Sequence, residues 1–141
     1  MTYALAEPLQ TALYGALSAD PGVSGLVGGH IYDAPLPLDG GSLPVNYVLI
    51  GAEQVTNRAA KDVDGAIHDL TVTVHSNDDG FQTSKQIAGA ICDVLLDAQL
   101  TLARGRLVYM RFLKARADAG KAPVKRTITL RFRAFVEDSS T

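Results

Sequence analysis

The stretch that decides the fold is residues 68–98, HDLTVTVHSNDDGFQTSKQIAGAICDVLLDA, where a strand pattern is followed closely by a helix pattern. In the first part, Leu70, Val72 and Val74 alternate with polar residues, and successive side chains of a strand point to opposite faces of a sheet. In the second part, the apolar residues recur at the spacing of one helix face, at Ile87, Ile91, Val94, Leu95 and Ala98. The pair predicts a sheet with one face covered by helices.

The rest of the chain extends this unit. Apolar residues at helical spacing predict a first helix over about 4–18, ended by Asp20, Pro21 and Gly22. Residues 30–32 could form a short edge strand, and residues 45–50 have the β-branched and aromatic composition of a full strand. Alternation predicts two more strands, one over 106–116, inside the sheet because both of its faces are partly apolar, and one over 127–136.

We therefore expect a single α+β domain spanning 1–141, with a mostly antiparallel sheet of about four strands and two helices packed on one face. Residues 51–66 separate two strands that can pair antiparallel. The simplest prediction is that these residues form a long two-stranded arm projecting past the sheet. Residues 117–124 form a second loop, with basic residues around it. Gly89 weakens the second helix and could allow close packing there.

Composition and length exclude several classes of protein. The chain has 141 residues, 47% hydrophobic and 20% charged, which suits one continuous core and argues against disorder. Glu7 and Pro8 stand where a secretion signal would be basic, and no apolar run approaches the ~20 residues that span a bilayer, so we expect a soluble protein. A lone cysteine, Cys92, cannot form an internal disulfide or a zinc site, and its place on the helix stripe favours core packing over a nucleophile.

Charge divides sharply along the chain. Through Gln99 there are three basic and twelve acidic residues, a net of −9, whereas the remainder has ten basic and three acidic residues, a net of +7. Such a division suits a nucleic-acid surface, and it suits equally well copies of one chain that dock acidic patch to basic patch. A third interpretation is that the folded sheet interleaves the two parts, so that their charges intermix on one surface.

No arrangement of residues points to catalysis or metal binding. His68 and Asp69 are neighbours on a strand and therefore point to opposite faces. His75 lies near Asp78 and Asp79, without the spacing of a metal site. We expect a non-enzymatic protein with no metal and no other cofactor.

Five segments together resemble the small tail terminator, or tail completion, family of long-tailed phages, in the version carried by phage-like gene transfer agents. They are LQTALYGALSADPGVSGLVGGHIYDAPLP (9–37), LTVTVHS (70–76), KQIAGAICDVLLDA (85–98), GRLVYMRF (105–112) and TLRFRAFVE (129–137). The resemblance implies a subunit of a hexameric ring on the head-proximal end of the tail tube of a phage-like particle assembled in the host cytoplasm. The ring would end tube polymerisation, receive the head connector or stopper protein, and leave a channel through which DNA passes without specific binding.

The resemblance also suggests which residues meet partners. The arm, the basic loop and the last strand are the expected contacts with a neighbouring subunit, the tail tube protein or the connector, through Glu53, Arg58, Lys61, Asp62, Asp64, Lys114, Arg116, Lys121, Lys125, Arg126, Arg131 and Arg133. The polar face of the central strand would meet solvent, a neighbouring copy or the channel, through Asp69, Thr71, Thr73 and His75. Two alternatives stay open, namely a head-completion or stopper ring protein, and a nucleic-acid-binding module that uses the basic C-terminal strand.

Overall fold

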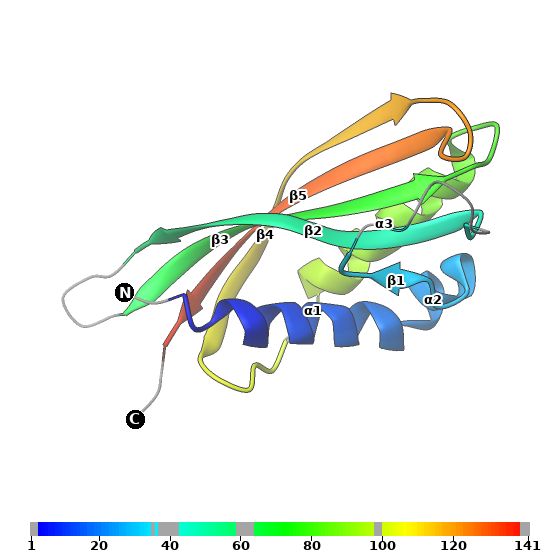
Figure 1. Cartoon of the computed structure of the whole chain (residues 1–141). Coiled ribbons are helices and arrows are strands. Elements are labelled where there is room, and N and C mark those ends of the chain that lie inside the picture. The colour runs from blue at the N-terminus through cyan, green and yellow to red at the C-terminus, as the bar shows by residue number, and fades with distance from the viewer. Residues whose placement is uncertain (1–2, 35, 37–42, 59–63, 98–99, 139–141) are drawn as a thin grey trace.

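The computed structural model describes residues 3–34, 36, 43–58, 64–97 and 100–138, which form a five-stranded sheet and three helices (Figure 1). The sheet order is β1-β2-β3-β5-β4. β1 pairs with β2 in parallel, and the other neighbours are antiparallel. In chain order the elements are α1 (Ala6–Ala19), α2 (Pro21–Val27), β1 (Ile31–Tyr32), β2 (Asn46–Asn57), β3 (Gly65–Ser76), α3 (Gln82–Asp97), β4 (Arg106–Ala119) and β5 (Arg126–Glu137).

The α+β class is confirmed, but the expected count of four strands and two helices is wrong. The additional helix is α2. It forms because Asp20 both ends α1 and caps the start of the next helix. Its carboxylate accepts a hydrogen bond from the Val23 amide at 2.9 Å, and Pro21 provides a first-turn residue with a fixed φ, so the same residues begin a new helix. The short edge strand becomes β1, and it raises the strand count to five.

One face of the sheet carries the core. Even-numbered residues of β3 and β5 point toward the helices, and Phe132, Leu130 and Val74 are almost completely buried. The helices supply the other half of the core from one stripe each, including Leu9, Leu13, Leu17, Ile87, Ile91 and Leu95. Figure 1 shows the helices on the same side of the twisted sheet, which leaves the opposite face open. None of the described helices is both long enough and apolar enough to cross a membrane.

β4 lies at an edge of the sheet, so its predicted place inside the sheet is wrong. It pairs only with β5, and its outer half from Arg111 to Ala117 is exposed. The pairing register shifts at 107/109 and again at 112/114, which leaves Val108 and Leu113 without a residue opposite them on β5. These bulges explain the misleading apolar pattern, since they change which face each following residue occupies.

The expected projecting arm is also different in the structure. β2 continues to Asn57 through a register shift between Ile50 and Glu53, and β3 stays paired with β5 as far as Gly65 opposite Glu137. β4 also pairs with β5 at this level, through Arg106 opposite Glu137, so the region is a four-stranded part of the sheet rather than a two-stranded projection. Gly89 likewise has no packing role, because a Cβ placed there would meet no atom within 4 Å.

Candidate assembly surfaces

The open face of the sheet holds the polar residues of β3 and β5. Asp69, Thr71, Thr73 and His75 lie on it, opposite Arg133, Arg131, Thr129 and Thr127 respectively. Arg133 donates to both carboxylate oxygens of Asp69, with Nε–Oδ1 at 2.8 Å and Nη2–Oδ2 at 3.3 Å. The pair raises the pKa of Arg133 through this hydrogen bonding and charge attraction. Arg133 is therefore already engaged by a carboxylate of its own chain.

Aromatic rings occupy the β1 end of this open face. The ring of His75 stacks on Tyr47 with centroids 4.8 Å apart, and its Nε2 lies 2.9 Å from the Thr73 hydroxyl oxygen. Burial in this stack lowers the pKa of His75. Tyr32 packs edge-on against Tyr47 and is also 2.8 Å from His30 Nδ1 through its hydroxyl oxygen. The row is well packed, and among the described residues no group of three or more His, Cys, Asp or Glu side chains could hold a metal ion.

Arg131 sits between Thr71 on β3 and Lys114 on β4 and is half-buried. Its Nε is buried and has no hydrogen-bond partner among the described residues. A guanidinium nitrogen that is out of water and unsatisfied carries a free-energy cost, which an acceptor from another molecule could relieve.

Of the residues expected on the arm, Glu53 is used within the chain. It accepts a hydrogen bond from the Tyr3 hydroxyl, and its other carboxylate oxygen lies 3.6 Å from Nδ1 of fully buried His68. Burial lowers the pKa of His68 more than the nearby Glu53 carboxylate raises it. Arg58 is exposed after β2, and the backbone oxygen of Asp64 accepts from the Asp138 amide at 2.8 Å. Lys61 and Asp62 lie outside the described residues.

The basic loop has both anchored and exposed members. Lys125 Nζ lies 2.9 Å from Asp79 Oδ1, which lowers the pKa of Asp79, and Arg126 donates to the Asp79 backbone oxygen. The Arg126 guanidinium also lies over the Phe81 ring, 4.9 Å from its centroid. These contacts tie the start of β5 to the segment before α3. Lys121 is exposed and makes none of these contacts.

The outer half of β4 is the most exposed regular part of the described chain. Phe112 and Leu113 are 45% and 41% exposed, and Lys114 is exposed with no acidic partner among the described residues. Arg111 lies over the Tyr109 ring at 4.2 Å. Arg116 pairs at 3.0 Å with Asp118, and both side chains are exposed. Mixed apolar and cationic side chains on an unpaired edge are typical of a surface that a partner covers.

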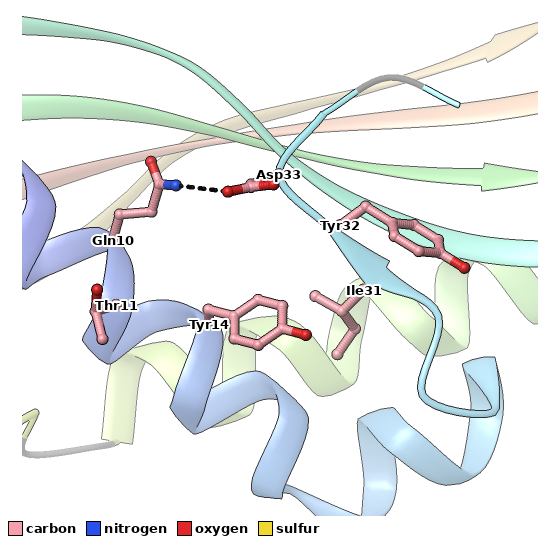
Figure 2. A pocket seen from close by; sticks show the side chains of 6 residues that line it. All are labelled: Gln10, Thr11, Tyr14, Ile31, Tyr32 and Asp33. Atoms are coloured by element: carbon pink, nitrogen blue, oxygen red, sulfur yellow. Dashed lines mark hydrogen bonds between the residues drawn. The ribbon is translucent and has the colours of Figure 1, made fainter. Parts of the chain in front are cut away.

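At the opposite edge of the sheet, α1 and β1 enclose a pocket of about 330 Å³ that was not expected from the sequence. Gln10, Thr11 and Tyr14 line it from the helix, and Ile31, Tyr32 and Asp33 line it from the strand (Figure 2). Gln10 Nε2 donates to Asp33 Oδ2 at 3.3 Å, and Thr11 donates to Glu7 at 3.0 Å. The pocket is therefore aromatic and acidic.

One feature of the sequence could have indicated this pocket. Tyr14 is 45% exposed and lies at the side of the stripe of buried leucines on α1. An aromatic residue outside the apolar stripe, with Glu7 and Gln10 on the same helix, can indicate a binding surface. The contribution of 31–33 could not be inferred, since only the fold brings β1 beside α1.

The acidic and basic parts of the sequence stay partly separated in the folded protein. Two ion pairs join the acidic and basic parts, Asp69 with Arg133 and Asp79 with Lys125. Part of the remaining exposed charge is separated: Glu7 and Asp33 lie beside the pocket, at the β1 edge, whereas Arg111, Lys114 and Arg116 lie on β4 at the other edge. Complete intermixing of the charges is therefore not observed among the described residues.

Comparison with known proteins gives the class. A family model described as tail completion protein gp17 matches residues 11–137. A solved chain from the virion of a native gene transfer agent particle is 43% identical, with a TM-score of 0.86, and the alignment covers 96% of this chain and 99% of that one. No curated protein sequence matches.

The molecule is thus a structural protein of the phage-tail class. The chain belongs to the tail completion protein gp17 family, as the match across most of its length shows. The predicted family, and the predicted similarity to the version in gene transfer agents, are both confirmed.

Proposed function

We propose that this protein caps the head-proximal end of the tail tube as a ring, most simply a hexamer. In this role it ends tube polymerisation, offers its other face to the head connector or stopper protein, and surrounds a channel for DNA. The family match over 11–137 carries the proposal, since completion of a tail requires a subunit that binds the tube and does not extend it. The work is structural and needs no catalytic group, metal or other cofactor.

The distribution of charge supports a closed ring. A ring of identical subunits uses a heterologous contact, in which two different surfaces of the chain meet. This chain has an acidic, hollowed edge at β1 and a basic, projecting edge at β4, on opposite sides of one sheet. Complementary charges of this kind favour the correct orientation of neighbouring copies.

Engagement of Arg133 by Asp69 argues against the basic last strand as a nucleic-acid-binding surface. A strand that binds single-stranded nucleic acid combines free cations with exposed aromatic rings. Here Arg133, one of the three β5 arginines, is already neutralised, and Phe135 is packed beside the Tyr109 ring with centroids 5.6 Å apart. This arrangement suits a surface against which DNA slides, or a subunit contact, better than a gripping surface.

Deletion of the gene in a producing strain tests the proposal. Electron microscopy of the particles should show tubes of uncontrolled, excessive length, and a gold-labelled copy supplied in trans should restore normal length and appear at the head-proximal tube end. Tubes of normal length attached to leaking heads would instead support a stopper ring and contradict the capping role. Salt-sensitive binding of single-stranded DNA that is lost in the Arg131→Glu, Arg133→Glu variant would favour the nucleic-acid module.

A further inference from the structure

We propose that the pocket between α1 and β1 receives the basic outer half of β4 from a neighbouring copy of this chain. The inference rests on the proposed ring, and it specifies the surfaces that close it. The pocket residues are Gln10, Thr11, Tyr14, Ile31, Tyr32 and Asp33, and the inserted side chains are those of Lys114 and Arg116.

The chemistry of the pocket selects a cation. Asp33 provides a carboxylate whose contact among the described residues is the 3.3 Å hydrogen bond from Gln10, which leaves oxygen lone pairs for a further donor. Tyr14 supplies a ring and a hydroxyl group on the α1 side of the hollow (Figure 2). A carboxylate beside an aromatic ring binds ammonium and guanidinium groups by charge-assisted hydrogen bonds and cation–π attraction. Glu7, held near the rim by Thr11, adds negative potential.

β4 presents matching groups that its own chain leaves available. Lys114 is exposed without an acidic partner in the described part of the chain, and the Arg116–Asp118 pair is so exposed that it can exchange partners at little cost. Phe112 and Leu113, on the same outer half, would lose their exposed apolar surface in such a contact. The strand also keeps an unpaired edge, because β5 occupies its other side.

The pairing register places the two surfaces on one level of the sheet. Tyr32 is opposite Leu49, Leu49 is opposite Thr73, Thr73 is opposite Thr129, and Thr129 is opposite Arg116. A second copy set beside the β1 edge, without sliding along the strands, therefore brings its Arg116 to the level of Tyr32. Lys114 then falls two residues along β4, next to the level of Asp33.

Repetition of this contact uses a different surface on each side of the subunit, so the copies assemble head to tail. A heterologous contact of this kind closes into a ring when its rotation permits. An isologous dimer would instead bring two pockets or two β4 strands together, with like charges facing, which is unfavourable.

Thiol cross-linking in purified particles tests the contact. In a Cys92→Ser background, the Thr11→Cys, Lys114→Cys double variant should give a covalent ladder of subunits with a short thiol-specific cross-linker. A mixture of the Thr11→Cys and Lys114→Cys single variants should stop at the dimer, and each single variant alone should give none. Dimers with Thr11→Cys alone, or no ladder in particles whose tubes have normal length, would overturn the docking proposal and leave the capping role intact.

A charge exchange provides a second, independent readout. Asp33→Lys should lower the yield of completed particles at least about tenfold, and Lys114→Glu with Arg116→Glu should do the same, because like charges then meet. The combined triple variant should recover to within about threefold. Asp93→Lys on exposed α3 is the matched control and should change the yield less than about twofold. Failure of the triple variant to recover would contradict the contact, whereas a ladder in particles with overlong tubes would support the contact and contradict capping.

Discussion

Arg133 on β5 and Asp69 on β3 form a two-point ion pair across neighbouring strands, with 2.8 Å between Arg133 Nε and Asp69 Oδ1. The pair joins the basic last part of the chain to its acidic first part, and it occupies the open face of the sheet. Because its charges are partly balanced within the chain, this face attracts anions only weakly. It can therefore lie against another subunit or face a channel.

The Arg133–Asp69 ion pair predicts the effect on stability of exchanging the two charges. Arg133→Asp alone should lower the urea midpoint of unfolding, since two carboxylates then face each other across the ladder, and Asp69→Arg with Arg133→Asp should recover most of the loss. Circular dichroism during urea titration measures both. A double variant as unstable as the single one would show that Arg133 contributes by packing rather than by charge.

Two histidines, His68 fully buried and His75 half-buried, predict a pH dependence of stability. Burial lowers the pKa of His68 and of His75, so below about pH 6.5 the unfolded chain takes up protons that the folded chain does not. The contribution of the two histidines to the free energy of unfolding should therefore be constant above that pH. Below it, the free energy of unfolding should fall as the pH drops, by at most about 1.4 kcal/mol per pH unit for each histidine.

Variants separate the two contributions. His68→Gln should reduce the slope of stability against pH between about pH 6.5 and 5, and His68→Gln with His75→Gln should nearly abolish it in that range. Chemical denaturation at a series of pH values gives the slopes. An unchanged slope in the double variant would assign the effect to carboxylates instead.

Glycines 105 and 89 predict opposite results for the same substitution. Gly105 has φ +80°, and a Cβ there would lie 2.7 Å from the Glu137 backbone oxygen and 2.8 Å from Leu5 Cδ2. Gly105→Ala should therefore cost about 1–3 kcal/mol of unfolding free energy. Gly89→Ala in α3 meets nothing within 4 Å and should instead stabilise the protein by about 0.5–1 kcal/mol. Thermal unfolding distinguishes them, and destabilisation by Gly89→Ala would mean that the exposed side of α3 is packed.

Two phenylalanines in contact have different roles. Phe132 is completely buried and Phe112 is 45% exposed, although their rings pack edge to face with centroids 6.0 Å apart. Phe132→Ala should cost about 3–5 kcal/mol through cavity formation. Phe112→Ala should cost no more than about 1.5 kcal/mol and should reduce assembly if β4 is covered by a neighbour. Equal losses of stability would show that β4 is part of the core.

The basic loop predicts unequal effects of its cations. Arg126→Ala removes the contact with the Phe81 ring and the hydrogen bond to the Asp79 backbone oxygen, which should cost about 1–2 kcal/mol. Lys121→Ala, on the exposed part of the same loop, should change stability by less than about 0.5 kcal/mol. Urea unfolding of the two variants is the measurement. Similar stabilities would mean that Arg126, like Lys121, is free to meet a partner.

Several interface residues inferred from sequence stay predictions, but the structure narrows their possible roles. Lys114 and Arg116 remain accessible on β4. Glu53 and Arg133 are already held by Tyr3 and Asp69, so their charges are less available to a partner. Spacing along the chain could not reveal this, because each of those contacts joins residues 50 or more positions apart.

The sequence by itself determined the elements with strong local periodicity. The alternation in 70–74 and in 128–136, and the stripes of α1 and α3, identified a sheet with one face covered by helices, because burial of one face imposes a period of two or 3.6. The order of weak motifs along the chain was also sufficient to identify the family. These are properties of local pattern, which a linear sequence contains.

Only the tertiary structure decided which strands lie at the edges and which charges remain unpaired. The bulges of β4 hid its edge position, and the start of α2 at Asp20 looked like the end of a helix, since capping residues and helix-ending residues are the same types. The pocket depends on β1 lying beside α1, and the availability of Lys114 depends on what the fold places around it. Both the pocket and the availability of Lys114 depend on contacts between residues far apart in the sequence. The spacing of residues along the chain does not show such contacts.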